Sequence, residues 1–552
     1  MQRTGITNHA RFLMLLAWGV IVMAAGNALA SDWPQWRGRA HDGLSTETGW
    51  LTNWPPRVVW SNAIDYGESS VVISEGRLYT MGRRSSEPNY SNAVICLDAA
   101  TGINVWTQVY PTKYRQSLPD YGTLSTPTIA GNDLYEYDDN GDLYCFDKNT
   151  GSNKWSLAVD WHQSYYGYGS SPLVEGDLVI LNAGGGVAAV SRTTHEIVWS
   201  LPNASSQDEY TSPVGMTLNG RRAVLIQAKS DAGTSIQAIN PTNGVIYWST
   251  NFATKVSFEM ADPVVSGNRI YVLHYGLLQV APDMSGVSSV WGTNSPSTYS
   301  ATPVVLGDYV YQFKGATLAC IDLRDNTKMW STNSIGHGTA QGALTLADGK
   351  LIIFASGKLR VAKASPTSFD EGGRVAVTLG TGGTDLQNFG YASPILSNGR
   401  IYCRFKDKLV CYQAGPNPPA DTNKNGIADG WEAKYFTNTC DSASDSDGDG
   451  APNISEYITG ADPTNKTSCL KAQISLVNSS IVVSCPTVAG GGANYEFRSR
   501  YYSMEQAMGL TNSGSWQGVT GLTDILGTGE TIRLTNSVTA SNRYYRVSVR
   551  LD

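Results

Sequence analysis

An internal repeat runs through most of this chain and limits the folds that it can adopt. The repeat is marked by a tryptophan that recurs at intervals of 39 to 49 residues. These tryptophans are Trp60, Trp106, Trp155, Trp199, Trp248, Trp291 and Trp330. Self-similarity at a period of about 20–50 residues indicates one supersecondary unit repeated along the chain, as in solenoids and propellers.

Each repeat predicts four short strands. A Ser/Thr-x-Pro segment opens it, as in STPTIAGNDLY from Ser125, and a Gly-Asn or Gly-Asp turn joins the first two strands. A second segment, DLYCFDKNTGSNKW at 142–155, supplies the third strand, a tight turn and a fourth strand with the tryptophan. Repeats of about 40–45 residues with four strands are typical of the blades of a β-propeller.

The number of repeats predicts eight blades arranged in a closed ring. Eight opening segments begin near residues 69, 125, 170, 211, 261, 301, 341 and 392. The last repeat ends at Tyr412 without a tryptophan-bearing strand, whereas Trp60 precedes the first complete blade. We therefore expect the strand around Trp60 to complete the eighth blade, because this pairing removes an exposed sheet edge. The seventh blade lacks its tryptophan, and we expect its last strand to begin at Arg374.

Two segments resemble a known family. The phrase L-Y-C-x-D-x-x-T-G-x-x-x-W at 143–155 resembles the pyrroloquinoline-quinone-type (PQQ-like) propeller repeat, and DWPQWRG from Asp32 resembles the entry segment of its exported bacterial members. The resemblance covers residues 31–414, for which it implies an eight-bladed propeller. It does not imply one activity, because the family includes quinoprotein alcohol dehydrogenases and non-catalytic propellers such as an outer-membrane assembly lipoprotein.

The dehydrogenases of that family carry features that this chain lacks. The resemblance implies an adjacent Cys-Cys pair and a calcium ion held by Glu and Asn beside an Asp base, but no Cys-Cys dipeptide is present. Glu68, Glu259 and Asp262 lie at the entrances of first strands, where we expect solvated loop carboxylates. We therefore assign no catalytic residue and do not expect pyrroloquinoline quinone. A quinoprotein oxidoreductase with the quinone in the funnel remains the alternative.

The repeated tryptophans and cysteines have a structural explanation. One tryptophan at the same place in each blade indicates packing between blades. Cys96, Cys145, Cys320 and Cys411 share one position on the third strand, and equivalent positions in a ring are too far apart for disulfides. They are expected to be small buried hydrophobes. A disulfide between Cys403 and Cys411 across a hairpin is one alternative.

Aromatic side chains gather in the segments that enter the first strands. These segments converge at one mouth of the central channel, where aromatic rings with a polar end suit a protein or polysaccharide partner. The candidate ligand-binding residues are Tyr66, Tyr121, Tyr168, Tyr210, Tyr299, His337 and Tyr391. The alternative is that these rings wedge between neighbouring blades. Nucleic acid is not expected as a partner, because the net charge is -7 and no basic block is present.

Two calcium-binding motifs follow a Pro-rich linker, within residues 415–467. Each matches the loop D-x-[DN]-x-[DN]-G-x5-E, in which alternating oxygen ligands wrap a hard cation and a glycine permits the sharp turn. The first loop (421–432) offers Asp421, Asn423, Asn425, the Ile427 carbonyl, Asp429 and Glu432. The second loop (445–456) offers Asp445, Asp447, Asp449, the Ala451 carbonyl, Asn453 and Glu456. The pair predicts two calcium ions and resembles the EF-hand-like loops of dockerin-type and thrombospondin-type-3 repeats.

The two loops differ in charge. The first contains three carboxylates and the second four, and ligand charge tunes calcium affinity, so the second is expected to bind more tightly. Very short helices are expected near residues 431–436 and 454–459. These features favour a structural clip over a calcium-driven switch.

The two ends of the chain predict export and a further β-module. Residues 1–30 combine Arg3 and Arg11 with a short apolar run and an Ala-Leu-Ala site, as in a signal peptide. No later segment is apolar enough to span a membrane, which predicts an exported, periplasmic, extracellular or surface protein. Residues 468–552 show short strands at 472–477, 480–485, 494–502, 531–536 and 543–551, typical of an antiparallel β-sandwich.

The sequence therefore predicts an all-β, secreted scaffold. It consists of an eight-bladed propeller closed by an N-terminal strand, a calcium module and a β-sandwich. The expected function is non-catalytic binding of a protein or polysaccharide partner. Envelope assembly is an alternative scaffold function.

Overall fold

The computed structural model describes most of the chain after the predicted signal peptide, which lies outside the described residues. These are 32–50, 54–85, 90–112, 122–159, 167–183, 186–202, 210–230, 233–252, 260–293, 301–333, 335, 342–377, 392–415, 421–437, 439–477, 480–489, 494–495, 500–507, 516–519, 521–523, 525–537 and 544–551. They fall into two compact units, one ending at 415 and one built from 421–489 and 500–551. No helix in these ranges is long and apolar enough to cross a membrane.

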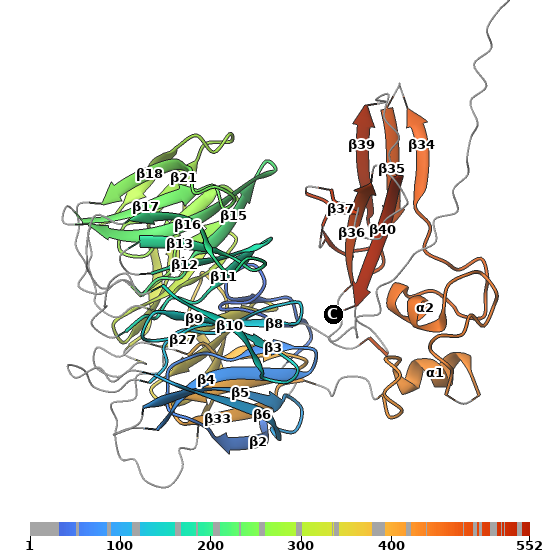
Figure 1. Ribbon diagram of the computed structural model, residues 1–552, viewed down its shortest axis with the longest axis horizontal. Coiled ribbons are helices and arrows are strands. Elements are labelled where there is room, and N and C mark those ends of the chain that lie inside the picture. Colours follow the sequence, from blue (N-terminus) through green and yellow to red (C-terminus); the bar gives the residue numbers. More distant parts are fainter. Residues whose placement is uncertain are drawn as a thin grey trace, which may run out of the picture. The chain divides into compact units, whose positions relative to one another are not determined.

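In its described residues, the first unit is a propeller-like set of eight sheets, antiparallel except for one parallel pair of strands (Figure 1). The first four sheets follow the chain in order. They contain β3 (Val72–Ser74), β4 (Arg77–Ser85), β5 (Ser91–Asp98) and β6 (Asn104–Pro111); β7 (Thr128–Ala130), β8 (Asp133–Tyr137), β9 (Asp142–Asp147) and β10 (Asn153–Ala158); β11 (Leu173–Glu175), β12 (Leu178–Asn182), β13 (Gly186–Ser191) and β14 (Ile197–Pro202); and β15 (Val214–Leu218), β16 (Arg221–Ser230), β17 (Gly233–Ile239) and β18 (Ile246–Phe252).

The other four sheets include two strands from the N-terminal region. They contain β19 (Val264–Ser266), β20 (Arg269–Val272), β21 (Gly276–Val280) and β22 (Val287–Gly292); β23 (Val304–Leu306), β24 (Tyr309–Lys314), β25 (Thr317–Asp322) and β26 (Lys328–Ser331); β1 (Leu44–Ser45), β27 (Ala343–Ala347), β28 (Lys350–Ala355), β29 (Lys358–Lys363) and β30 (Asp370–Ala376); and β2 (Arg57–Ala63), β31 (Ile395–Ser397), β32 (Arg400–Phe405) and β33 (Lys408–Gln413). Strand β2 pairs antiparallel with β33, and Trp60 lies opposite Cys411. This is the pairing that the repeat count predicted for the N-terminal strand.

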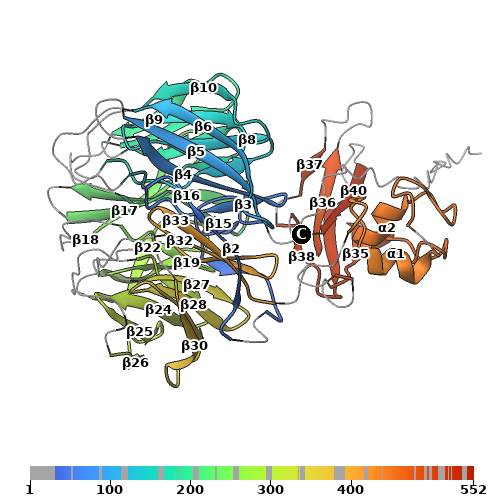
Figure 2. The same cartoon turned by 90° about the horizontal axis from the view of Figure 1, so that it is seen from below.

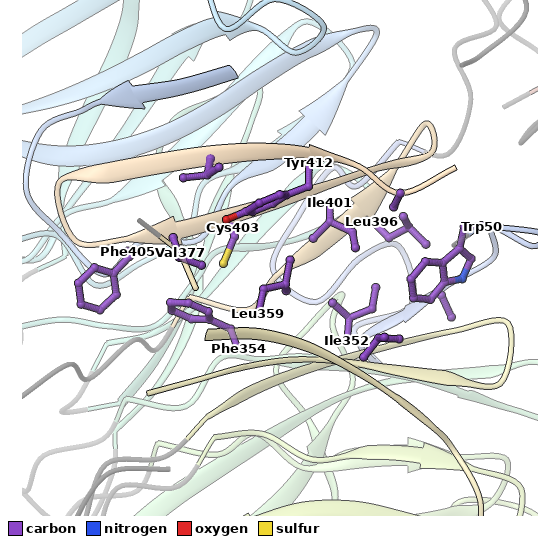
Figure 3. Close-up of a cluster of buried hydrophobic side chains, with 14 residues drawn as sticks. Trp50, Ile352, Phe354, Leu359, Val377, Leu396, Ile401, Cys403, Phe405 and Tyr412 are labelled. Carbon is purple, nitrogen blue, oxygen red and sulfur yellow. The ribbon is translucent and has the colours of Figure 1, made fainter. Parts of the chain in front are cut away.

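Buried hydrophobic clusters pack each sheet against the next. In Figure 3, Ile352, Phe354 and Leu359 from one sheet face Ile401 and Cys403 from the following one. Another cluster packs the sheet of β31–β33 against that of β3–β6, so the last repeat contacts the first. Both faces of these sheets are therefore covered, which explains the nearly continuous apolar runs in the sequence.

The repeated tryptophans join neighbouring sheets, as the sequence predicted. The Trp60 indole Nε1 donates to the Ala99 carbonyl of the next sheet at 3.1 Å, and Trp106 donates to the Lys148 carbonyl at 3.1 Å. Gly102 has a φ of +73°, and a Cβ atom built on it would lie 2.6 Å from the Trp60 ring. The glycine of the repeated Thr-Gly turn is thus required both by the turn and by the neighbouring tryptophan.

A chain of hydrogen bonds links the innermost strands of successive sheets. In five of the opening segments, the second residue donates its backbone N–H to the side chain of the second residue in the next opening segment. The bonds run from Ser70 to Thr126, Thr126 to Ser171, Ser171 to Ser212, Ser212 to Asp262 and Asp262 to Thr302, at 2.7–3.0 Å. In the seventh sheet the position is Gly342, which has no side chain to continue the series. The residue directly before the proline of the repeated Ser/Thr-x-Pro motif therefore connects blades.

An N-terminal strap, residues 32–49, crosses several innermost strands. Trp33 exchanges two backbone hydrogen bonds with Ile73 in the first sheet, at 2.8 and 2.9 Å. The guanidinium of buried Arg37 donates to the Pro303 carbonyl of the sixth sheet at 2.6 Å. Strand β1 pairs in parallel with β27 of the seventh sheet. The strap thus fastens strands that are far apart along the chain.

The suggested disulfide between Cys403 and Cys411 is wrong. Cys403 lies opposite Val410, and Cys411 lies opposite Tyr402. Because a shift of one residue turns a side chain to the other face of a sheet, the two thiols belong to different hydrophobic clusters. Cys96, Cys145, Cys320 and Cys411 are buried and unpaired, as predicted.

The described residues of the second unit form two short helices and two antiparallel sheets. The helices are α1 (Asp429–Tyr435) and α2 (Asn453–Thr459), close to the ranges expected from the sequence and labelled in Figure 2. One sheet contains β34 (Gln473–Val477), β35 (Ser480–Pro486) and β39 (Thr531–Ser537); the other contains β36 (Arg500–Ala507), β37 (Gln517–Gly518), β38 (Ile525–Leu526) and β40 (Tyr544–Leu551). The predicted strand at 494–502 overlaps β36, which continues to Ala507, whereas residues 496–499 lie outside the described residues. We call β34–β40 the C-terminal β-module.

Candidate functional site

The first loop is closed by its own hydrogen bonds. Asp421 accepts the backbone N–H groups of Asn425 at 3.1 Å and Gly426 at 2.9 Å. Glu432, on α1, is buried, and its Oε1 accepts the Cys440 N–H at 2.8 Å and the Asn425 side-chain amide at 2.9 Å. The last ligand position of this loop therefore already has hydrogen-bond donors.

The remaining ligand positions of the first loop also take part in local turns. Asn423 Oδ1 accepts the Asn425 N–H at 3.1 Å, and Asn425 Oδ1 accepts the Ile427 N–H at 2.9 Å. The Asp429 carboxylate accepts two hydrogen bonds from Thr422. These bonds hold the pKa of Asp429 below its ordinary value.

The second loop brings its carboxylates together. Asp445 accepts the Gly450 N–H at 2.8 Å, while Asp447 and Asp449 each accept one backbone N–H from two residues further on, that of Ala451 in the case of Asp449. One oxygen from each of these three carboxylates lies within 4.8 Å of the others. This is the only such group of His, Cys, Asp and Glu side chains within the described residues.

Several oxygens of the second loop are buried without a hydrogen-bond partner in the described part of the chain. They are Asp447 Oδ2, Asp449 Oδ2, Asn453 Oδ1 and both carboxylate oxygens of Glu456. Burial, reinforced by the charges of Asp447 and Asp449, raises the pKa of Glu456 to about 8. An unpaired buried polar group costs free energy, so a bound cation would stabilise this set of oxygens.

The donor set fits calcium. Calcium takes six to eight oxygen ligands at about 2.3–2.6 Å, from carboxylates, amide carbonyls and backbone carbonyls. The second loop supplies four carboxylates and the amide of Asn453, on a loop turned sharply at Gly450, whose φ is +97°. The first loop supplies the same types of oxygen, but its Glu432 is hydrogen-bonded within the protein.

The predicted rim residues do not share one environment. Tyr168 and Tyr210 are 1% and 7% exposed, and the Tyr168 ring lies 5.2 Å from that of Tyr137. Tyr66 is half-buried. Burial of the first two rings favours the interpretation that they wedge between blades. Tyr121, Tyr299, His337 and Tyr391 lie outside the described residues.

One carboxylate considered for a quinone site, Asp262, has a structural role. Asp262 is buried, contrary to the expectation of a solvated loop residue, and accepts hydrogen bonds from Ser212 N–H at 2.7 Å and Trp36 Nε1 at 2.6 Å. One bond reaches each carboxylate oxygen, so this residue does not fit a general base. Glu68 is also buried, whereas Glu259 lies outside the described residues. We derive no step through a quinone.

A second acidic cluster lies between the first two sheets. Glu136 is fully buried and accepts a hydrogen bond from the Tyr110 hydroxyl, while Asp139 forms an ion pair with Arg83. Burial, together with neighbouring Asp138, raises the pKa of Glu136 well above its ordinary value. Burial and Asp139 raise that of Asp138 to about 7. The raised pKa values favour protonated Glu136 and Asp138, and the ion pair with Arg83 compensates the charge of Asp139.

Comparison with known proteins identifies the family of the first unit. The model of the family described as outer membrane protein assembly factor BamB matches residues 46–208, 91–332 and 232–424. Together these matches span 46–424, which is more than half of the 552 residues. The chain belongs to this family. Membership in the BamB family establishes the repeat type and the propeller-like fold, and it leaves the activity open.

Two solved structures are similar to this chain at low sequence identity. BamB from Moraxella catarrhalis is 15% identical, with a TM-score of 0.47, over 65% of this chain and 97% of that one. A quinohemoprotein alcohol dehydrogenase from Comamonas testosteroni is 12% identical, with a TM-score of 0.49, over 74% of this chain and 85% of that one. A search of curated proteins gave no match.

Proposed function

We propose that the chain is an exported, non-catalytic scaffold whose eight sheets form a closed propeller for a protein or polysaccharide partner in the cell envelope. The observation that carries this proposal is membership in the BamB family, which is described as an outer membrane protein assembly factor. The pairing of β2 with β33 and the packing of the last sheet on the first support ring closure. The internal bonding of Asp262 argues against a catalytic site there.

We place the partner at the mouth formed by the entry segments, because aromatic rings with a polar end suit a protein or polysaccharide partner. The strap does not distinguish the two mouths, since it contacts both ends of innermost strands. Asp32 accepts the Glu75 N–H after β3, whereas Trp36 donates to Asp262 before β19.

Substitution of the aromatic entry residues tests this proposal. Tyr121, Tyr299 and Tyr391 replaced together by alanine should weaken binding at least tenfold, with little change in melting temperature. The probes are a panel of envelope proteins and polysaccharides, with affinity measured for any member that binds the wild type. Buried Tyr168→Ala is the matched control and should lower the melting temperature. Wild-type affinity in the triple variant would contradict the proposed site.

A quinoprotein oxidoreductase is the second candidate, because the family resemblance includes such enzymes. The purified chain would be mixed with pyrroloquinoline quinone and calcium, desalted and examined by absorbance. We expect no quinone spectrum to remain with the protein. Stoichiometric retention, with dye reduction in the presence of an alcohol, would replace the scaffold proposal.

We also propose that each loop of the second unit binds one calcium ion as a structural ligand. The unpaired oxygens of Asp447, Asp449 and Glu456 support this for the second loop. The repeated motif supports it for the first. Affinities on the order of 10⁻⁴–10⁻³ M are expected, as in extracellular calcium modules.

A further inference from the structure

Helix α2 connects the second loop to the rest of its unit. Its first turn carries Asn453 and Glu456, two of the predicted ligands, and it ends only one turn later at Thr459. Six of its seven residues are buried. An ion that fixes Glu456 would therefore also fix the last turn of this short helix.

Arg500 holds the C-terminal end of α2. This arginine, on β36, is 2% exposed. Its Nε donates to the Ile458 carbonyl at 2.7 Å, and its Nη1 donates to the Ala489 carbonyl at 2.6 Å. The last carbonyls of a helix lack partners within the helix, and a cation is favoured beside them. One guanidinium thus links α2 to the segment after β35.

The helix end is shaped to fit this arginine. Gly460 caps α2 with a φ of +83°, and its N–H donates to the Glu456 carbonyl at 2.7 Å. A Cβ atom built at Gly460 would lie 3.0 Å from Arg500 Nη2. The cap therefore needs glycine for its backbone conformation and for the close approach of Arg500.

Strand β36 connects Arg500 to other strands of the C-terminal β-module. It pairs with β40 along its whole length, from Arg500 opposite Leu551 to Ala507 opposite Tyr544. It also pairs with β37 and β38, and α2 itself contacts β40. The helix that carries Glu456 is therefore in direct contact with the sheet that Arg500 begins.

We propose that calcium binding at the second loop stabilises the C-terminal β-module, and that Arg500 transmits the effect. This inference rests on the proposed calcium site. Without the ion, the buried oxygens of Asp447, Asp449 and Glu456 have no partner among the described residues, and this cost loosens the first turn of α2. A loosened helix presents its last carbonyls to Arg500 less often, so β36 opens more often. The ion reverses both effects, because it binds only the ordered loop.

Hydrogen exchange of the full chain, with and without calcium, tests this coupling. Calcium should slow exchange at least fivefold in peptides covering α2 and in peptides covering β36 and β40. Arg500→Met should keep the effect in α2 and lose it in β36 and β40. Arg546→Met is the matched control, since Arg546 pairs with Glu505 across the same two strands, and it should keep both effects. If Arg500→Met does not fold, Arg500→Lys serves instead, because an ammonium cannot reproduce the planar fork of the guanidinium.

The outcomes separate the coupling from the calcium site. Protection of α2 by calcium without protection of β36 in the wild type would overturn the coupling and leave the site intact. Calcium-dependent protection of β36 that survives in the Arg500 variant would overturn the role of Arg500. No calcium effect on α2 would overturn the calcium site itself.

Discussion

Two groups of oxygen acceptors in this chain obtain their partners in different ways. Around the innermost strands of the propeller-like unit, each Ser, Thr or Asp side chain accepts a backbone N–H from the preceding sheet; Asp262 also binds Trp36. In the second loop, buried oxygens of Asp447, Asp449 and Glu456 lack donors within the described residues. This series of acceptors is therefore completed from within the chain, whereas we propose that the oxygens of the loop are completed by a cation.

Removal of the N-terminal strap and β2 should have the largest effect. Deletion of residues 32–63 takes away the partner of β33 and the bonds that the strap makes to several innermost strands. We expect the propeller to lose its cooperative thermal transition, measured by calorimetry. An unchanged transition would mean that the ring does not need this segment.

Loss of the Asp262 carboxylate should be more damaging than loss of a neutral acceptor in the same series of hydrogen bonds. Asp262→Ala leaves the buried donors of Ser212 and Trp36 without an acceptor, at a cost of about 3 kcal/mol in the free energy of unfolding. Ser171→Ala removes one neutral acceptor of the same series and should cost about 1 kcal/mol. Equal effects in urea titrations of the two variants would contradict the special position of Asp262.

Calcium should stabilise the second unit through the second loop. At a free calcium concentration about 100-fold above the Kd, the gain in free energy of unfolding is about 2.7 kcal/mol. Glu456→Gln should abolish most of this gain, because the last ligand loses its charge. The measurement is the melting of the second unit with calcium and with a chelator. A full calcium response in the variant would argue against the second loop.

The acidic cluster of the propeller should respond to pH and not to calcium. Because the pKa of Glu136 is raised on folding, its contribution to stability is present below its unfolded value of 4.5 and is lost as the pH rises through the folded value. Glu136→Gln keeps the acceptor for Tyr110 and should become more stable relative to the wild type as the pH rises from 4 to 8. The difference changes by up to about 1.4 kcal/mol per pH unit. A flat difference would show that protons do not balance this cluster.

The first loop should show the smallest effect. In Glu432→Gln, the amide oxygen can still accept the Cys440 N–H, so we expect the free energy of unfolding without calcium to fall by only about 1 kcal/mol. Chemical denaturation in a chelator measures this change. A loss larger than that of Asp262→Ala would mean that Glu432 holds the unit together without an ion.

Local repetition made much of the fold predictable. The tryptophans, the opening segments and the missing fourth strand after Tyr412 indicated four-stranded units and the pairing of β2. The motif also located both loops and both helices. The link from Ser171 to Ser212 and the use of Asp262 by Trp36 could not be foreseen, because they join residues that become neighbours only in the folded protein.

The errors have the same physical origin. The sequence placed Cys403 and Cys411 on facing strands, but only the register shows that they point to opposite faces. Glu432 and Glu456 occupy the same motif position, so the sequence could not show that they differ. Glu432 accepts hydrogen bonds, whereas Glu456 has no hydrogen-bond donor among the described residues. The signal that could have suggested this is the pair of Asn residues in the first loop, since amides can donate where carboxylates cannot.

Isothermal titration of the full chain with calcium tests the central claim most directly. The wild type should show two binding phases of unequal affinity, and Glu456→Gln should lose the tighter one while keeping the weaker. Glu432→Gln should do the reverse. Identical titrations of the wild type and Glu456→Gln would contradict the claim that the buried oxygens of the second loop are completed by a cation.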